Sequence, residues 1–228
     1  MSALFPGLTP PKLPATIDLR CGDVRDLVRE VRGATLVHAD PPWLYAREAG
    51  VANPETHGIY DGMSEAEIST ILDAAYDCAA PGARLLCWAT WPKLVEFLSA
   101  GGAGKRWEYV SGGAWTKILN NGGVGFHWRS TTEPVLVFVK RGAATHRDHA
   151  ANLYNGATTQ AQQHSRKPES WLTRMLLYWT KPDDLVLDLW AGLAPMATAC
   201  KLEGRRYVGA EIDPERHGRA CSFVASAS

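Results

Sequence analysis

Short apolar runs alternate along this chain with segments in which apolar residues recur every three or four positions. Residues 34–39 form a short, apolar, β-branched run, which is typical of a strand buried in a parallel sheet. The segment after Ser64 instead places its apolar residues at helical spacing. Ser64 and Glu67 have the spacing of a capping box, so a helix is predicted to begin there and to end before Pro81.

The same alternation continues to the end of the chain. Strands are predicted at residues 16–21, 34–39, 84–89, 107–115, 134–139, 184–189 and 206–210. Helices are predicted at residues 24–31, from 64, from 92, at 168–179, from 195 and from 214. Because strands alternate with helices, we expect an α/β, Rossmann-like fold with a mostly parallel sheet and helices on both faces.

Three segments lack either pattern. Residues 1–14 contain four prolines and are expected to form an extended arm, followed by a single domain over residues 15–228. Residues 45–61 are polar and contain glycine, which predicts a loop over the carboxyl edge of the sheet. Residues 141–165 are polar without a hydrophobic period, which also predicts a loop.

Charge is balanced overall but unevenly distributed. Lys plus Arg and Asp plus Glu both number 24 in the 228 residues. Residues 18–77 carry twelve acidic and five basic residues, whereas residues 117–167 carry seven basic and two acidic residues. The basic stretch therefore favours a surface that contacts nucleic acid, although two solvated faces of opposite sign are the alternative.

Cysteine use and hydropathy bear on location. The five cysteines show no C-x-x-C spacing, which argues against a zinc site and against a disulfide framework. No apolar run reaches membrane-spanning length, and the N-terminus lacks the layout of a signal peptide. We therefore expect a cytoplasmic protein with no metal site and no membrane contact.

The candidate chemistry starts directly after the strand at 34–39. Asp40 offers a carboxylate that accepts hydrogen bonds, and Pro42 restricts Pro41 to an extended conformation that fixes the direction of its carbonyl. Trp43 supplies a flat face on which a base can stack. Two fixed acceptors beside a stacking surface are suited to an exocyclic amino group on a nucleobase. Ligands bind beyond the carboxyl ends of strands in such sheets, so the position fits a catalytic role.

A second candidate site lies in the last third of the chain. Residues 188–194 form a strand-to-helix junction that contains Gly192, and Glu211 follows nineteen residues later at the end of the next strand. A glycine turn and an acidic residue in this order hold the ribose of adenosine-containing cofactors, although a purely structural turn explains the pattern about as well. Ala194 replaces a second glycine, and Pro195 removes an amide that a pyrophosphate would use. A nucleoside cofactor without phosphates is therefore favoured over NAD or ATP.

Lys167 stands just before the predicted helix at 168–179. At the edge of a helix start, its ammonium is a candidate to hold a carboxylate. A solvated surface lysine is the alternative.

Several segments together resemble the DPPW-type adenine-N6 methyltransferases, a family that includes the eukaryotic messenger-RNA adenine methyltransferases and many bacterial and phage proteins. The resemblance is carried, in the family's order, by residues 21–25, 40–43, 60–68, 115–117, 125–133, 141–142 and 164–169. Residues 188–194 and 209–213 are more similar to the permuted bacterial DNA amino-methyltransferases, in which the catalytic motif precedes the cofactor turn.

The resemblance implies a methyltransferase fold with permuted motif order, S-adenosylmethionine as cofactor, and a role for each matching residue. It implies that Asp23 and Val24 lie by the cofactor's adenine, Glu211 by its ribose and Lys167 by its methionine carboxylate. The full cofactor set is Asp23, Val24, Asp40, Lys167, Asp188, Ala191, Gly192, Glu211 and Ile212, and the catalytic set is Asp40, Pro41, Pro42 and Trp43. The residues expected to contact nucleic acid are Trp43, Tyr45, Lys117, His127, Arg129 and Arg166.

The expected activity is methyl transfer from S-adenosylmethionine to N6 of adenine in nucleic acid, with DNA favoured over RNA because the chain is compact. Cytosine-N4 methylation is the nearest alternative, since that amino group needs the same two acceptors. A catalytically inactive nucleic-acid-binding subunit is another. A nicotinamide dehydrogenase would leave residues 40–43 unexplained. Loops at 45–61, 120–129 and 141–165 are the candidates for sequence recognition.

Overall fold

The computed structural model describes residues 15–44, 62–117, 131–142, 153–156 and 167–227. The helices in these ranges are α1 (Val24–Glu30), α2 (Glu65–Cys78), α3 (Trp91–Ser99), α4 (Glu169–Trp179), α5 (Pro195–Glu203) and α6 (Pro214–Ser226). The strands are β1 (Ile17–Cys21), β2 (Ala34–Ala39), β3 (Ala79–Trp88), β4 (Glu108–Lys117), β5 (Thr132–Val139), β6 (Leu153–Gly156), β7 (Leu185–Asp188) and β8 (Arg206–Glu211). Among the helices described, none is long and apolar enough to cross a lipid bilayer.

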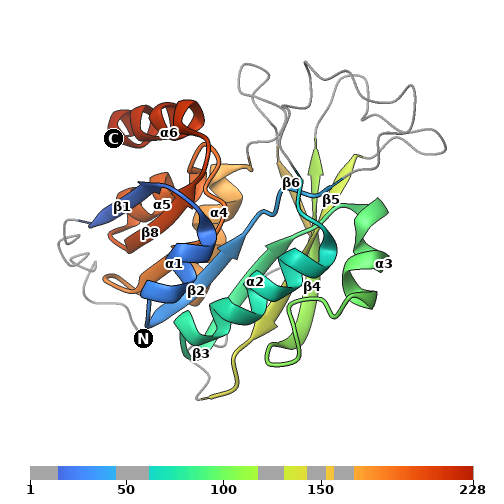
Figure 1. The fold of residues 1–228 in the computed structure, drawn as a ribbon. Coiled ribbons are helices and arrows are strands. Elements are labelled where there is room, and N and C mark those ends of the chain that lie inside the picture. The colour runs from blue at the N-terminus through green and yellow to red at the C-terminus, as the bar shows by residue number, and fades with distance from the viewer. Residues whose placement is uncertain (1–14, 45–61, 118–130, 143–152, 157–166, 228) are drawn as a thin grey trace, which may run out of the picture.

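The eight described strands form one sheet in the order β1-β8-β7-β2-β3-β5-β4-β6 (Figure 1). The pairs from β1 to β3 and the pair β4–β6 are parallel, whereas β5 is antiparallel to both of its neighbours. The predicted α/β fold with a mostly parallel sheet is thus confirmed. From β2 the chain continues to β3 on one side, while β7 on the other side leads to β8, so the strand order reverses between β2 and β7. Ligands bind at such a switch point in open α/β sheets.

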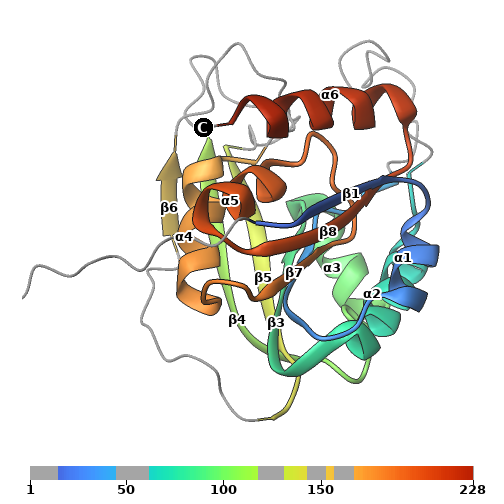
Figure 2. The same cartoon turned by 90° about the vertical axis from the view of Figure 1, so that its left-hand side faces the viewer.

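Helices cover both faces of the sheet, as expected (Figure 2). Helices α1, α2 and α3 pack on one face and α4, α5 and α6 on the other, and each layer closes its own apolar core. Successive strand residues alternate between the two cores: Val37 and Leu187 belong to the first, and Leu36 and Val186 to the second. Because β2 and β7 are buried on both sides, their carboxyl ends are rigidly supported.

The helix starts follow from local capping. Ser64 and Glu67 form the predicted capping box at the start of α2, with both reciprocal hydrogen bonds present. Asp23 caps α1, and Asp213 caps α6 ahead of Pro214. All the predicted helices and strands are present, and most of their ends differ from the prediction by one or two residues.

Two details of the prediction were wrong. Strand β3 begins at Ala79 rather than Arg84 and runs through Pro81, which lacks a backbone donor. The register between β2 and β3 shifts at this point, since Ala34 pairs with Ala79 and Leu36 with Arg84, and such an irregularity tolerates a proline. The segment 141–165, which was predicted as a loop, contains β6, a four-residue strand that pairs with β4. Strands this short carry no hydrophobic period.

Candidate functional site

The site begins where the central strand β2 ends. Asp40 follows Ala39 at the carboxyl edge of the sheet, beside the end of β7. The two proline carbonyls after it differ in their hydrogen bonding. The Pro42 carbonyl accepts the Met63 N–H at 2.7 Å, whereas no backbone N–H of the described residues donates to the Pro41 carbonyl. Among the described residues, the Pro41 carbonyl is therefore the backbone acceptor left open beside the Asp40 carboxylate.

A short parallel bridge to Met63 holds the chain after Asp40. Trp43 is bridged to Met63, and the Leu44 N–H donates to the Met63 carbonyl at 3.1 Å. A Cβ added at Gly62 would lie 2.8 Å from the Leu44 nitrogen, so only glycine fits this close approach. The half-buried Trp43 indole packs edge-on against Phe97 of α3, with ring centroids 5.3 Å apart. This packing fixes the orientation of the indole.

Four alternating charges lie in a row at this edge of the sheet. The Lys167 ammonium lies 2.7 Å from Asp40 Oδ2 and 3.3 Å from Glu133 Oε2. The Lys117 ammonium pairs with the other oxygen of Glu133. Lys167 and Glu133 are largely buried, with side chains 8% and 15% exposed. The row joins the ends of β2, β4 and β5 to the segment that precedes α4.

The buried charges of the row stabilise one another. Burial by itself lowers the pKa of Lys167, but the Asp40 and Glu133 carboxylates outweigh it and hold that pKa above its ordinary value. Burial likewise raises the pKa of Glu133, but Lys167 and Lys117 outweigh it and hold that pKa below its ordinary value. Both groups are therefore charged at neutral pH. Lys167 is not the solvated surface lysine of the alternative interpretation.

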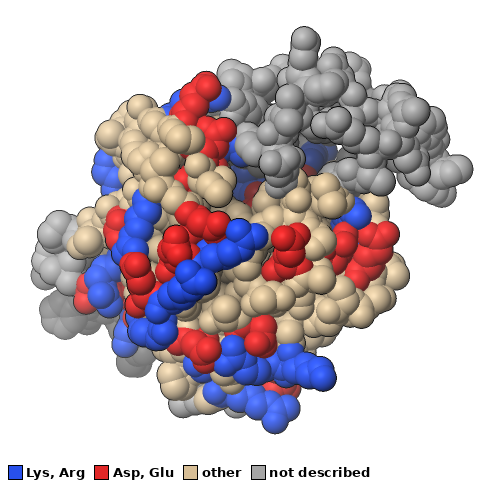
Figure 3. Space-filling model, in the orientation of Figure 1, with Lys and Arg blue, Asp and Glu red and all other residues tan. Residues whose placement is uncertain are grey.

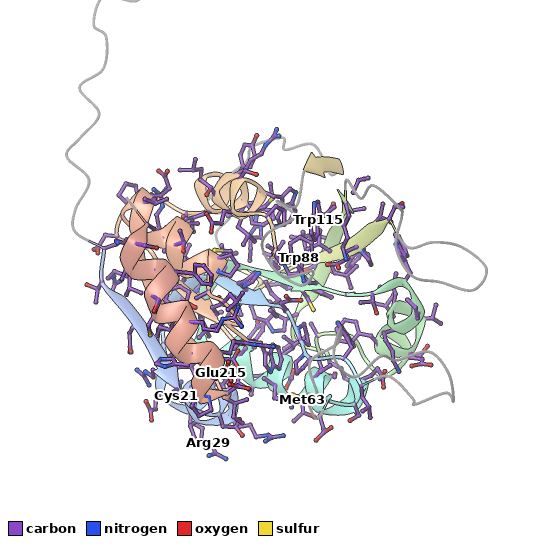
Figure 4. The ribbon with its side chains drawn as sticks, turned by 90° about the horizontal axis from the view of Figure 1, so that it is seen from above. Cys21, Arg29, Met63, Trp88, Trp115 and Glu215 are labelled. Carbon is purple, nitrogen blue, oxygen red and sulfur yellow. The ribbon has the colours of Figure 1, made fainter. Side chains whose placement is uncertain are left out.

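Aromatic rings lie beneath the row. The Lys167 ammonium lies 5.1 Å from the centroid of the Trp88 ring, and the Lys117 ammonium 5.4 Å from that of Trp115. The two indoles are neighbours in Figure 4, with centroids 6.2 Å apart. Both are buried, so they give the cations an apolar floor and a favourable cation–π contact.

The glycine turn forms the second part of the site. Gly192 has a positive φ of 57°, and Ala194, one residue before α5, has φ 53°. The left-handed region favours glycine, so Ala194 occupies it at a cost of about 1 kcal/mol. The Glu211 carboxylate accepts the N–H of Gly192 at 2.9 Å and that of Asp213 at 3.0 Å. Burial raises the pKa of Glu211, while these two backbone hydrogen bonds oppose the rise.

The start of α1 and the residue after β8 border the same carboxylate. Cys21 pairs with Glu211 across β1 and β8, and the Gly22 N–H donates to the Glu211 carbonyl at 3.0 Å. The structure therefore brings residues 23–24 close to Glu211 at the same edge of the sheet. Val24 is buried, and the Asp23 side chain caps α1 and pairs with a neighbouring arginine. Ile212 is 66% exposed, an unusual degree for an isoleucine beside a buried carboxylate.

Asp188 occupies a different environment from the other predicted residues. Its side chain is fully buried below the turn and accepts from Tyr207 at 3.0 Å and from His38 at 2.8 Å. The carboxylate therefore supports the turn from within the sheet. Sequence reasoning did not assign a role to His38, Tyr207, Trp88 or Glu133. A histidine inside an otherwise apolar strand is a usable signal, because a buried polar side chain needs a partner.

Other predicted features fall partly outside the described residues. Tyr45, His127, Arg129 and Arg166 lie outside them, as does the arm at 1–14. On the face shown in Figure 3, the described part of the acidic N-terminal stretch has basic and acidic side chains mixed over α1 and α2. In the described ranges no three His, Cys, Asp or Glu side chains gather to hold a metal ion.

Comparison with solved structures gives the same architecture. The complex of M1.HpyAVI with S-adenosylmethionine matches with a TM-score of 0.68 at 14% identity, over 92% of this chain and 100% of that chain. TTHA0409 from Thermus thermophilus, complexed with S-adenosyl-L-methionine, matches at 0.67 and 18% identity over 92% and 95%. The cytosine-N4-specific PvuII DNA methyltransferase matches at 0.66 and 15% identity over 92% and 88%. At these identities the likeness shows a shared fold.

A family model gives the assignment. The N6/N4 methyltransferase model, described as DNA methylase, matches residues 34–220. The match begins with β2, which leads into Asp40, and reaches into α6. It therefore includes both residues 40–43 and the glycine turn at 188–194. Since it spans most of the chain, this protein belongs to the DNA methylase family.

Proposed function

We propose that this DNA methylase transfers a methyl group from S-adenosylmethionine to the N6 amino group of adenine in DNA. The observation that carries the proposal is the pair of acceptors at the end of β2. The Asp40 carboxylate and the Pro41 carbonyl stand at the switch point between β2 and β7, next to the glycine turn.

The residues around the turn fit the cofactor. A Cβ added at Gly192 would meet no atom within 4 Å, so the space beside the turn is open at this point. The Glu211 carboxylate borders this space and is suited to accept the ribose hydroxyls, and the exposed Ile212 offers an apolar surface for the adenine. Asp23 and Val24 complete the adenine side. Ala191 lines the turn, and Asp188 supports it from below.

Lys167 is proposed to hold the methionine carboxylate. An ammonium has three N–H donors, and Asp40 and Glu133 account for two of them. Within the described residues the third donor has no hydrogen-bond acceptor, and it is proposed to bind a carboxylate at the same edge of the sheet. Because Lys167 contacts Asp40 directly, the cofactor and the reacting base would meet at the same pair of side chains.

The bound cofactor supplies an electrophilic methyl group on a sulfonium. The protein's part is to prepare and orient the amino nitrogen, whose lone pair is otherwise delocalised into the ring. Hydrogen bonds from its two protons to Asp40 and to the Pro41 carbonyl favour a tetrahedral nitrogen with a directed lone pair. Asp40 is also placed to accept the proton that this nitrogen releases. The rest of the rate comes from positioning for in-line transfer.

Trp43 supports adenine as the base, and DNA as the polymer fits the family. The indole, held against Phe97, is proposed to stack on the flipped-out base. Lys117, in the charged row, is proposed to lie on the DNA side together with Tyr45, His127, Arg129 and Arg166. The resemblance of residues 40–43 and 125–133 to adenine-N6 enzymes is the reason for choosing adenine over cytosine.

Product analysis tests the proposal. The purified protein is incubated with S-adenosylmethionine carrying a labelled methyl group in three separate reactions. These contain unmethylated duplex DNA, single-stranded DNA or RNA. The products are digested to nucleosides and identified by mass spectrometry. Labelled N6-methyl-2′-deoxyadenosine is expected from the DNA substrates. N4-methylcytosine instead would establish the cytosine activity named for the PvuII enzyme, and nucleic-acid binding without cofactor binding would indicate a non-catalytic subunit.

A further inference from the structure

A buried chain of hydrogen bonds crosses four neighbouring strands beneath the site. The Trp88 indole N–H donates to His38 Nε2 at 3.0 Å, and His38 Nδ1 lies 2.8 Å from Asp188 Oδ1. The Tyr207 hydroxyl donates to Asp188 Oδ2 at 3.0 Å. Each of the four residues is at most 2% exposed. The proposed transfer step uses none of these groups directly.

The chemistry of the four groups fixes the direction of every bond. An indole N–H can only donate, so His38 Nε2 must be the acceptor and His38 Nδ1 must carry the proton. Asp188 then accepts one bond on each oxygen, from His38 and from Tyr207. The chain is complete, and a complete buried network of this kind favours one arrangement of the strands that carry it.

The four residues lie directly below both parts of the site. Strands β3, β2, β7 and β8 are neighbours in this order and carry Trp88, His38, Asp188 and Tyr207. His38 is two residues before Asp40, and Asp188 is the last residue before the segment of the glycine turn. The chain of hydrogen bonds therefore joins the strand that presents the acceptors to the strand that presents the turn.

A backbone contact reports on the same junction. The Leu189 N–H, directly after β7, donates to the His38 carbonyl at 3.0 Å. This bond closes only when the carboxyl ends of β2 and β7 are in register. This hydrogen bond lies between the buried side chains of His38 and Asp188 and the glycine turn. The rate at which it opens therefore measures how firmly the carboxyl ends of β2 and β7 are held together.

Gly209 leaves the space on β8 that the Tyr207 phenol occupies when it contacts Asp188. It stands opposite Asp188 in the pairing of β7 with β8. A Cβ added there would collide with the phenol of Tyr207 and lie 2.7 Å from its Cζ atom. Tyr207 and Gly209 share a face of the strand, so the phenol reaches Asp188 across the space that glycine leaves.

We propose that His38 and Tyr207 are positioning residues for methyl transfer, which act through Asp188 to hold the ends of β2 and β7 at a fixed separation. This inference rests on the proposed function, because the separation sets the distance between Asp40 and the cofactor turn. An error of about 1 Å in such an arrangement can cost about a hundredfold in rate. Binding of either substrate alone does not require the same alignment.

The experiment breaks one bond of the chain in two independent ways. Tyr207→Phe removes the hydroxyl, and Gly209→Ala displaces it. We expect each to lower kcat about tenfold per folded protein and to change the cofactor Kd less than about twofold. The double variant is expected to lose no more rate than Gly209→Ala alone, because the added methyl group already displaces the ring and leaves no bond for the hydroxyl to lose. His38→Asn, which keeps a donor near Asp188, is expected to retain more rate than His38→Leu.

Thr180→Val is the matched control. Thr180 carries a buried hydroxyl that donates to the Leu176 carbonyl at the end of α4 and accepts from Arg205 Nε, away from the carboxyl ends of the strands. Its removal is expected to lower thermal stability without lowering kcat. An equal loss of kcat in Thr180→Val and Tyr207→Phe would overturn the inference, because the chain would then be one more buried polar cluster. So would wild-type kcat in Tyr207→Phe.

Amide hydrogen exchange supplies a readout that needs no activity. The Leu189 N–H is expected to exchange about tenfold faster in Tyr207→Phe than in the wild type, and at the wild-type rate in Thr180→Val. Unchanged exchange in Tyr207→Phe would contradict the coupling of the strand ends. If the wild type transfers no methyl group, the proposed function fails, and the exchange rates still decide whether the chain couples β2 to β7.

Discussion

The ammonium of Lys167 lies 2.7 Å from Asp40 Oδ2, although the two residues are 127 positions apart in the sequence. This contact joins the residue proposed to hold the cofactor to the residue proposed to hold the base. Glu133 shares the same ammonium at 3.3 Å. The Asp40 carboxylate is therefore held in place by the buried Lys167 ammonium, which Glu133 in turn holds in place.

Asp40 is expected to be essential for transfer and dispensable for folding. Asp40→Asn keeps the shape but places a donor where an acceptor is needed, and Asp40→Ala removes the acceptor. We expect both to lower the rate of methyl transfer at least about a thousandfold. Because Lys167 keeps Glu133 as a partner, the far-ultraviolet circular dichroism should be unchanged. Near-normal transfer of label by either variant would sink the proposed role of Asp40.

Lys167→Met is expected to weaken cofactor binding. The change removes the donor proposed for the methionine carboxylate, so the Kd for S-adenosylmethionine, measured by calorimetry, should rise about tenfold or more. It also leaves the partly exposed Asp40 carboxylate without its ammonium partner and leaves Glu133 with Lys117 alone, at a cost of up to about 3 kcal/mol in the free energy of unfolding. Lys117→Met is the control, since Lys117 contacts Glu133 and not Asp40. Equal cofactor affinity in the two variants would argue against the role of Lys167.

The Glu133 contribution to stability should depend on pH in a defined direction. Its pKa in the folded protein lies below the ordinary 4.5, so its contribution is present above that pH and is lost as pH falls through the folded pKa. The Lys167 pKa lies above the ordinary 10.5, so that contribution is lost only as pH rises through its folded value. The difference in unfolding free energy between wild type and Glu133→Gln should be constant from pH 4.5 to 10.5. Urea titrations check this, and a difference that disappears near neutral pH would contradict the ion pair.

Gly192→Ala should weaken cofactor binding much more than it lowers the stability of the fold. The added methyl group meets no protein atom within 4 Å, so the stability cost is limited to the left-handed backbone strain of about 1 kcal/mol. It would stand where the cofactor is proposed to lie, so cofactor affinity should fall more than about tenfold. Gly33→Ala is a matched control, with φ 82° and equally open surroundings away from the site. The same cofactor affinity in both variants would show that the turn approaches no ligand.

Trp43→Ala should impair use of DNA rather than of the cofactor. Loss of a stacked base is worth about 1–3 kcal/mol, so KM for DNA should rise about tenfold or more while the Kd for S-adenosylmethionine stays near the wild-type value. Trp43→Phe retains a ring against Phe97 and should recover part of the loss. A variant that binds the cofactor poorly but uses DNA normally would reverse the assignment of Trp43.

Local patterns predicted nearly all of the fold. The capping box at Ser64 and Glu67 and the apolar run at 34–39 act within a few residues, so helix α2 and strand β2 could be predicted with close bounds. The exceptions are β6 and the start of β3. Both depend on backbone pairing with a strand elsewhere in the sheet, and neither leaves a periodic signal of its own.

The two halves of the candidate site differ in the same way. By itself the sequence determined that Asp40 directly follows one strand and that Glu211 ends another, because each comes directly after a local apolar run. Only the tertiary structure decided that Lys167 joins Asp40 to Glu133, and that His38 meets Asp188 across 150 positions of chain. Such contacts depend on the order of strands in the sheet, and the placing of β7 beside β2 is a property of the whole fold.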